Sequence, residues 1–142
     1  MLQRVTRASV QVDGATVGRI GPGLLLLVAI APDDDADTVV WMARKCAELR
    51  IFADDDGLMN RSLLDTRGDI LLISQFTLYG DARKGRRPSF IGSAEPELAK
   101  QRYEEFGALL ADMDIDVEWG IFGAHMEIES VNDGPVTLIL ER

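Results

Sequence analysis

Hydrophobic and polar positions alternate at the start of the chain and then give way to continuous apolar runs. QRVTRASVQVD and ATVGRIG flank Asp13-Gly14, a dipeptide that favours a tight hairpin between two strands. The run LLLLVAI that begins at Leu24 is continuous enough to be a central strand. The stretch from Asp33 to Leu49 opens with acidic residues and continues with apolar residues at helical spacing, and it predicts the first helix. LRIFA then predicts a strand, and the Asp54–Gly57 segment predicts a turn.

The second half of the chain repeats this mixture of elements. The run LLISQFTLYG at residues 71–80 predicts a strand, although polar side chains interrupt it. Ser93 is the predicted N-cap of a second helix with Pro96 in its first turn. Three strands are expected afterwards, IDVEWGIF, MEIESV and VTLIL, the last two joined by a turn at residues 132–135. Hairpins with two interspersed main helices predict a single α+β domain over residues 1–142, with largely antiparallel sheets.

Composition places the chain among globular proteins of one domain. Of its 142 residues, 46% are hydrophobic and 27% are charged. The N-terminus has no apolar signal-peptide core, and the longest apolar run, at residues 24–31, is too short to span a bilayer. The single cysteine, Cys46, excludes an internal disulfide, fits a reducing compartment and is expected in the core. We therefore expect a cytoplasmic protein with no membrane partner.

Charge limits the kinds of partner that the chain can bind. Fifteen basic and twenty-four acidic residues give a net charge of −9, which argues against a protein that coats nucleic acid through its phosphates. One local exception exists in ARKGRRPSF, where Arg83, Lys84, Arg86 and Arg87 fall within five positions. Such a cluster is either solvated surface or a grip for one end of a nucleic acid.

Familiar catalytic signatures are absent from the sequence. There is no cysteine pair, no histidine pair and no glycine-rich phosphate loop, so neither a metal nor a cofactor is expected. The Asp54–Gly57 segment lacks the later glutamate of a calcium loop and is interpreted as a solvated turn. A serine hydrolase would have to use His125, the sole imidazole, and no G-x-S-x-G motif surrounds any serine. Thr77 has no adjacent base in the sequence.

Two segments carry a resemblance to a known family. SQFTLYG at residues 74–80 and NDGPVTLIL at residues 132–140 are similar to the signature motifs of the D-aminoacyl-tRNA deacylases. The flanking segments QRVTRASVQVDG, LRIFADDDGLMNRSL and FGAHMEIESVNDGPVT follow in the family's order, so the resemblance covers nearly the whole chain. It implies a barrel-like domain that acts as a homodimer and hydrolyses the ester between a D-amino acid and the 3′-terminal adenosine of tRNA.

The resemblance also implies roles for particular residues. The pocket wall would be formed by Ser74, Gln75, Phe76 and Thr77, and the adenosine side by Phe122 and Met126. Gly134-Pro135 would be a Gly-cisPro element that enters the pocket of the partner subunit, supported by Arg4. The expected strand would end where the N–H groups of Phe76 and Thr77 become free to stabilise the ester oxyanion. Gln75 and Thr77 would share one strand face.

Mechanism and selectivity follow as further implications of the resemblance. The 2′-hydroxyl of the tRNA would assist the attacking water, which would explain the missing triad. The backbone carbonyls of Gly134-Pro135 would receive the substrate amino group and occupy the space of an L side chain, so that D-aminoacyl and glycyl esters are accepted. Two other hypotheses remain open: a non-catalytic dimeric module that binds tRNA ends or small ligands, and a serine or threonine hydrolase that uses His125.

Overall fold

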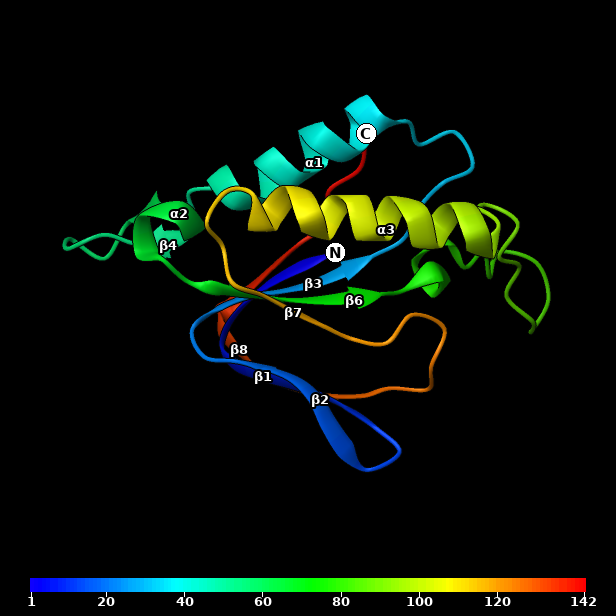
Figure 1. Cartoon of the computed structure of the whole chain (residues 1–142), viewed down its shortest axis with the longest axis horizontal. Helices are drawn as coiled ribbons and strands as arrows, with labels where there is room; N and C mark the ends of the chain where they lie inside the picture. The colour runs from blue at the N-terminus through cyan, green and yellow to red at the C-terminus, as the bar shows by residue number, and fades with distance from the viewer.

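The computed structural model describes residues 1–142 and shows one curved sheet with two long helices lying side by side on one face (Figure 1). The helices are α1 (Ala36–Glu48) and α3 (Pro96–Ala111). The sheet contains β1 (Leu2–Val12), β2 (Ala15–Ile20), β3 (Gly23–Val28), β6 (Asp69–Ser74), β7 (Val117–Trp119) and β8 (Glu127–Leu138). The shorter elements are β4 (Phe52–Ala53), β5 (Met59–Arg61), α2 (Leu63–Thr66) and the 3₁₀ helix η1 (Phe76–Tyr79).

The long strand β1 organises the sheet. Its first half pairs with β3 and its second half with β2, while β8 runs antiparallel along its opposite edge. The order β2-β1-β3-β6-β7 is mixed, because β3, β6 and β7 are parallel to one another. The two ends of this series meet: a Cβ on Gly18 of β2 would lie 2.9 Å from the carbonyl oxygen of Trp119 in β7. The sheet is therefore nearly closed into a barrel, and the predicted α+β class is confirmed.

Both faces of β3 and β6 are buried, which explains their continuous apolar sequences. Alternate side chains such as Leu24, Leu26 and Leu72 pack under the helices, together with Phe106 of α3. The intervening side chains fill the barrel interior with residues of β1 and β2; they are Leu25, Leu71, Ile73, Val5, Ala8, Val10 and Ile20. Cys46 lies in the layer under the helices, as expected, and burial raises the pKa of its thiol to about 12.

The first hairpin and the first helix confirm the sequence predictions. Asp13 and Gly14 have φ angles of 50° and 78°, the left-handed pair that a tight hairpin requires. Helix α1 begins after Asp35, whose carboxylate accepts a hydrogen bond of 2.8 Å from the Thr38 N–H. The predicted N-cap of the second helix is wrong. Glu95 precedes the helix without a side-chain cap, because Pro96, with its fixed φ, occupies the first helical position.

The C-terminal strands differ from the prediction. The two strands expected at residues 126–140 are one strand, β8, and residues 132–135 form an outward bulge within it. Both halves pair with β1, since Asn132 lies opposite Val5 and Thr137 lies opposite Gln3, so that β8 advances five residues while β1 advances two. The surplus residues leave the ladder. The predicted strand IDVEWGIF is ordered as β7 only at Val117–Trp119, because the following residues leave the sheet as a loop.

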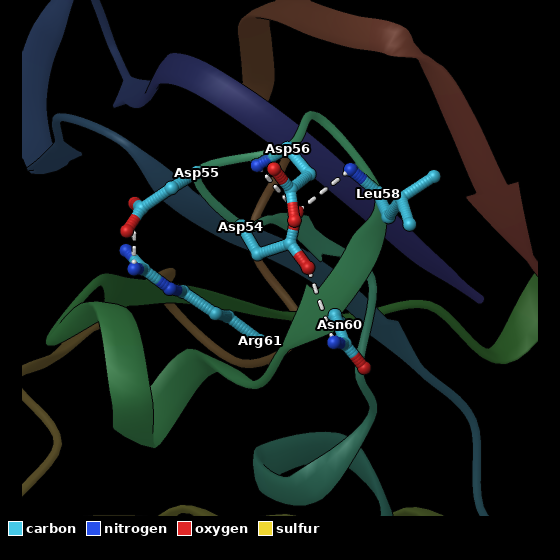
Figure 2. Close-up of polar contacts among 6 residues, drawn as sticks. All are labelled: Asp54, Asp55, Asp56, Leu58, Asn60 and Arg61. Atoms are coloured by element: carbon cyan, nitrogen blue, oxygen red, sulfur yellow. Dashed lines mark hydrogen bonds and ion pairs between the residues drawn. The ribbon is translucent and has the colours of Figure 1, made fainter.

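The acidic segment between β4 and β5 is a self-contained turn, as interpreted (Figure 2). The Asp54 carboxylate accepts hydrogen bonds from the N–H groups of Asp56 and Leu58 and from the amide of Asn60, at 2.9–3.1 Å. These bonds, led by the one from Leu58, lower the pKa of Asp54. The carboxylate is thus committed to holding the turn.

None of the helices combines the length and apolar character that a membrane crossing requires.

Candidate active site

A cavity of about 550 Å³ opens where the three parallel strands end. Its walls are the segments that follow their carboxyl ends: Val28–Ile30 after β3, Ser74–Phe76 after β6 and Phe122–Met126 after β7. The N-terminal half of α3, with Pro96, Ala99 and Tyr103, closes a further side. Parallel strands bring their carboxyl ends to one edge of the sheet, where α/β proteins commonly bind ligands. The lining is mostly hydrophobic, so the cavity suits an apolar group with a few oriented polar contacts.

Tyr103 fixes α3 to the floor of this pocket. Its hydroxyl donates a hydrogen bond of 2.7 Å to the backbone carbonyl of Leu72, and its ring packs edge-on against Trp119 with centroids 5.4 Å apart. Burial raises the pKa of Tyr103, so the phenol stays protonated in the ordinary pH range. It is a structural donor and supplies no general base.

The first signature segment passes from a strand to a 3₁₀ helix within the pocket wall. Strand β6 ends at Ser74, and the Gln75 N–H still donates to the Val28 carbonyl at 2.7 Å. The 3₁₀ helix η1 begins directly afterwards at Phe76, so the strand predicted to continue to residue 80 is wrong. Ser74, Gln75 and Phe76 line the cavity, whereas Thr77 does not and is exposed to solvent. The side chains of Gln75 and Thr77 nevertheless meet, because the Gln75 amide donates to the Thr77 hydroxyl.

The N–H groups of Phe76 and Thr77 lack partners because they begin a 3₁₀ helix, whereas the sequence predicted that they would lie at the end of a strand. The first N–H groups of a 3₁₀ helix have no acceptor inside the helix. In η1 these groups belong to Phe76 and Thr77, because the intrahelical bonds begin with the donation from Leu78 to Gln75. Phe76, which carries the first of these N–H groups, lines the cavity and is 53% exposed, and Thr77 follows it directly in η1.

The opposite wall contains the residues expected on the adenosine side. Met126 packs over Gly120, where an added Cβ would lie 2.7 Å from the methionine sulfur. The Phe122 ring lies 5.9 Å from the Tyr103 ring. His125 is at the exposed rim and makes no hydrogen bond to Ser74 or Thr77, and the Thr77 hydroxyl is bonded to an amide that cannot act as a base. The geometry thus gives no support to a histidine-activated hydroxyl.

The second signature segment lies apart from this pocket. None of Arg4, Gly134 and Pro135 lines the cavity, so one chain does not bring together all the predicted site residues. Gly134 and Pro135 are exposed, and the peptide bond between them is cis. Arg4 stands beneath them: its Nε is 2.9 Å from the Asp133 carboxylate, an ion pair without an aligned hydrogen bond, and its Nη1 donates to the Ile51 carbonyl. Arg4 thus joins the bulge to the segment before β4, and its role in supporting Gly134-Pro135 stays a prediction.

Asn132 braces the bulge, a role that sequence reasoning missed. Its side-chain oxygen accepts a hydrogen bond of 3.0 Å from the Val136 N–H, and its amide donates across the bulge to the Thr137 hydroxyl at 2.8 Å. Gly134 has φ 122°, in the region that side chains rarely adopt, and an added Cβ would lie 2.8 Å from Val136 Cγ2. The tendency of asparagine to bond nearby backbone was the available signal.

Sequence reasoning also missed three groups at the pocket. Phe90, Glu95 and Tyr103 line the cavity but come from a loop and a helix whose positions only the folded sheet fixes. Tyr103 is itself a buried residue of α3. No spacing in the sequence connects these residues to the SQFTLYG segment.

These features define a class of protein. The pocket offers free backbone donors beside an apolar cavity, with no activated side-chain nucleophile, and an exposed, braced turn lies elsewhere on the same chain. The family model for D-Tyr-tRNA(Tyr) deacylase matches residues 1–141.

Individual relatives agree with the family match. Proteins named D-aminoacyl-tRNA deacylase from Fervidobacterium nodosum and Deinococcus radiodurans are each 55% identical over 141 residues. The alignments cover 99% of this chain and 95% and 97% of those proteins. A solved structure described as a c-Myc DNA unwinding element binding protein is 38% identical, with TM-score 0.92 over 99% of this chain and 96% of that chain. The chain belongs to the D-Tyr-tRNA(Tyr) deacylase family, whose enzymes hydrolyse the ester bond of aminoacyl-tRNA.

Replacing Asn132 by alanine should loosen the bulge while leaving the barrel folded. The change removes the acceptor of the Val136 N–H and the donor to Thr137. Hydrogen exchange at the Val136 amide should accelerate by about 5-fold or more, since a lost hydrogen bond is worth about 1 kcal/mol and 1.4 kcal/mol is a factor of ten. Asn132→Asp keeps the acceptor and should protect that amide better than alanine does. Equal protection in wild type and Asn132→Ala would contradict the bracing role.

Proposed function

We propose that this chain is a tRNA-editing esterase of the cytoplasm that hydrolyses D-aminoacyl-tRNA as a homodimer, with each pocket completed by Gly134-Pro135 of the partner. The observation that carries the proposal is the division of the signature residues between two places. Ser74, Gln75 and Phe76 line the cavity, whereas Gly134 and Pro135 are exposed and lie outside it. The cytoplasm is where a tRNA substrate is found, and it suits a chain with one buried, unpaired cysteine.

The braced bulge has the properties that an inserted element needs. It is solvent-exposed, yet Asn132 bonds across it and Arg4 pairs with Asp133 beneath it. Ordering costs on association are smaller for a segment that is already held in one conformation. A second copy of the chain would provide the same bulge by symmetry, so that two equivalent composite sites form in a twofold dimer.

Catalysis would rest on backbone groups of the chain and on the substrate itself. As water attacks the ester carbonyl, its oxygen gains negative charge, and the N–H groups of Phe76 and Thr77 are available to receive it. The 2′-hydroxyl next to the ester assists the attacking water, and the terminal adenosine rests against Phe122 and Met126. This division of labour agrees with a pocket in which the Tyr103 phenol is committed to Leu72 and the Thr77 hydroxyl to Gln75.

Selectivity would come from exclusion by main-chain atoms. The carbonyl groups of Gly134 and Pro135 from the partner receive the α-amino group and occupy the volume that an L side chain would need. A D side chain points away from them, and glycine has no side chain to exclude, so glycyl-tRNA is a substrate as well. Because main-chain atoms carry the filter, the discrimination is independent of the substrate's side chain.

Turnover on matched substrates tests this function. At a protein concentration well below that of the substrate, the chain should release D-tyrosine from D-tyrosyl-tRNA over many cycles and leave L-tyrosyl-tRNA intact. Discrimination of at least about 100-fold is expected, since steric exclusion in a rigid site costs several kcal/mol and 1.4 kcal/mol is a factor of ten. Binding without turnover would instead support a non-catalytic tRNA-end module, and loss of activity in His125→Ala would support a histidine-dependent hydrolase.

The backbone donor of Phe76 can be removed directly. Phe76→Pro eliminates its N–H at the first position of η1, where the fixed φ of proline is tolerated. Phe76→Ala removes the same ring and keeps the N–H, so it is the matched control. Relative to alanine, the proline variant should lose about 100-fold in kcat, the usual effect of one oxyanion donor.

Two further outcomes bear on this mechanism. Replacement of the terminal 2′-hydroxyl by hydrogen should lower the rate more than Thr77→Ala or Ser74→Ala does. Equal kcat for Phe76→Pro and Phe76→Ala, or an acyl group trapped on Ser74 or Thr77, would contradict catalysis by backbone and substrate groups.

Mixed dimers test the composite site. Gly134→Ala should damage the bulge, because its φ of 122° and the 2.8 Å approach to Val136 leave no room for a methyl group. Phe76→Pro damages the other half of the site. Each homodimer should be nearly inactive, whereas mixing should restore about a quarter of the wild-type rate, since half of the dimers are mixed and each has one intact site. If mass spectrometry shows subunit exchange and activity does not return, the two halves belong to one chain.

A further inference from the structure

Residues 82–88 form a closed loop at the edge of the pocket, here called the basic loop. Its base is closed by Asp81 and Ser89, which exchange two backbone hydrogen bonds of 2.8 and 2.9 Å. In Figure 1 the loop projects beyond η1 and the start of α3, at the right of the view. The apex contains Gly85 with φ 74°, which allows the sharp reversal. All of these residues are exposed.

The four cations of the basic loop are not equivalent. Arg83 folds back onto Asp81, with hydrogen bonds of 2.9 Å and 2.6 Å from its guanidinium to the carboxylate, and this pairing raises the pKa of Arg83 and lowers that of Asp81. Lys84, Arg86 and Arg87 have no ion pair and remain exposed. A chain of net charge −9 thus presents three unpaired cations within four positions. The pairing of Arg83 with Asp81 holds the base of the loop that carries these three cations.

Aromatic rings connect the basic loop to the pocket. Phe90 follows the loop directly, lines the cavity, and packs edge-on against Phe76 with centroids 5.1 Å apart. Gly80 makes this packing possible, because a Cβ there would lie 3.1 Å from the Phe90 ring. The side chains of Phe76 and Phe90 remain 53% and 36% exposed. A path therefore runs from the apolar cavity across two exposed rings to three free cations.

We propose that Phe90 and the basic loop form a second contact for the tRNA 3′ strand, beyond the terminal adenosine. Phe90 stacks against a base that precedes the adenosine, and Lys84, Arg86 and Arg87 bind the adjoining phosphates. Combined stacking rings and backbone-binding cations are the general means of holding single-stranded nucleic acid. The otherwise acidic surface repels phosphates elsewhere, so the strand is oriented with its end toward the pocket. This inference rests on the proposed function, because it assigns the same substrate to the site.

Binding of an uncharged RNA tests the cations without requiring hydrolysis. The probe is a fluorescent acceptor-stem hairpin that ends in single-stranded CCA, and the variants are Arg86→Gln/Arg87→Gln and, as a control of equal charge change, Arg44→Gln/Lys45→Gln on exposed positions of α1. At about 0.1 M salt the loop variant should bind roughly 10-fold or more weakly, and its slope of log Kd against log salt should fall by about 1.5. The α1 variant should change binding by less than about 2-fold. Equal losses in both variants, or none in the loop variant, would overturn the proposal.

The aromatic part is tested at Phe90. Phe90→Leu keeps an apolar side chain against Phe76 but removes the ring, and Phe90→Tyr keeps the ring. The leucine variant should bind the CCA hairpin about 10-fold more weakly and the tyrosine variant as tightly as wild type, since base stacking on one aromatic side chain has effects of this size. A hairpin without the CCA end should bind wild type and Phe90→Leu alike. Unchanged binding of the CCA hairpin by Phe90→Leu removes the stacking role.

A hydrolysis assay separates this proposal from the proposed function. Arg86→Gln/Arg87→Gln should raise KM for D-tyrosyl-tRNA at unchanged kcat, and it should hydrolyse D-tyrosyl-adenosine, which has no phosphate, at the wild-type rate. If wild type hydrolyses neither ester while the RNA-binding differences hold, the proposed function fails and the basic loop remains an RNA contact. If wild type hydrolyses both esters and the variant matches it on both, the proposed function stands and the basic-loop contact is wrong.

Discussion

The parallel pairing of β3, β6 and β7 is the constraint on which the other features depend. Residues Gly23–Val28 of β3 pair in register with Asp69–Ser74 of β6, and side chains on both faces of these strands are buried. Parallel strands direct their carboxyl ends to the same edge of the sheet, where the chain leaves it. The pocket is the space among these departing segments. Tyr103 ties α3 to the carbonyl of Leu72 at 2.7 Å and so fixes the distance between the strand ends and the helix above them.

A site formed in this way supplies main-chain atoms more readily than activated side chains. The departing segments contain backbone groups that have lost their strand partners, as in η1, where the N–H groups of Phe76 and Thr77 precede the first intrahelical bond. Polar side chains nearby are bonded to one another or to backbone, as Gln75 is to Thr77 and Tyr103 is to Leu72. In the chemistry that we propose, backbone N–H groups of the chain orient the ester and stabilise the negative charge on its oxygen, and the substrate contributes its 2′-hydroxyl group.

The exposed features of the chain have been made rigid by local interactions. The bulge in β8 is bridged by Asn132 and supported by Arg4, although Gly134 and Pro135 face solvent. The basic loop is closed by Asp81 and Ser89, and Arg83 is used to hold it. Conformational entropy lost on folding is not lost again on binding. In the contacts that we propose with a partner subunit and with tRNA, neither surface would first have to become ordered.

The sequence by itself determined the elements whose causes are local. Asp13-Gly14 specifies the hairpin through its left-handed conformation, Asp35 caps α1, and Asp54 bonds its own turn. The continuous apolar runs identified the central strands, and the SQFTLYG and NDGPVTLIL segments identified the family. The interpretation of a strand through Thr77 was wrong, because hydrophobicity does not distinguish a strand from a short helical turn at a pocket wall.

Only the tertiary structure decided where distant segments meet. Two apparent strands joined at Gly134-Pro135 are one strand because both halves pair with β1, and no local pattern contains that information. Phe90 and Tyr103 became pocket residues through packing across the sheet ends, and the separation of Arg4 and Gly134-Pro135 from Ser74–Phe76 is a property of the nearly closed barrel. Contacts between residues far apart in sequence depend on the shape of the whole core, which short-range propensities leave undetermined.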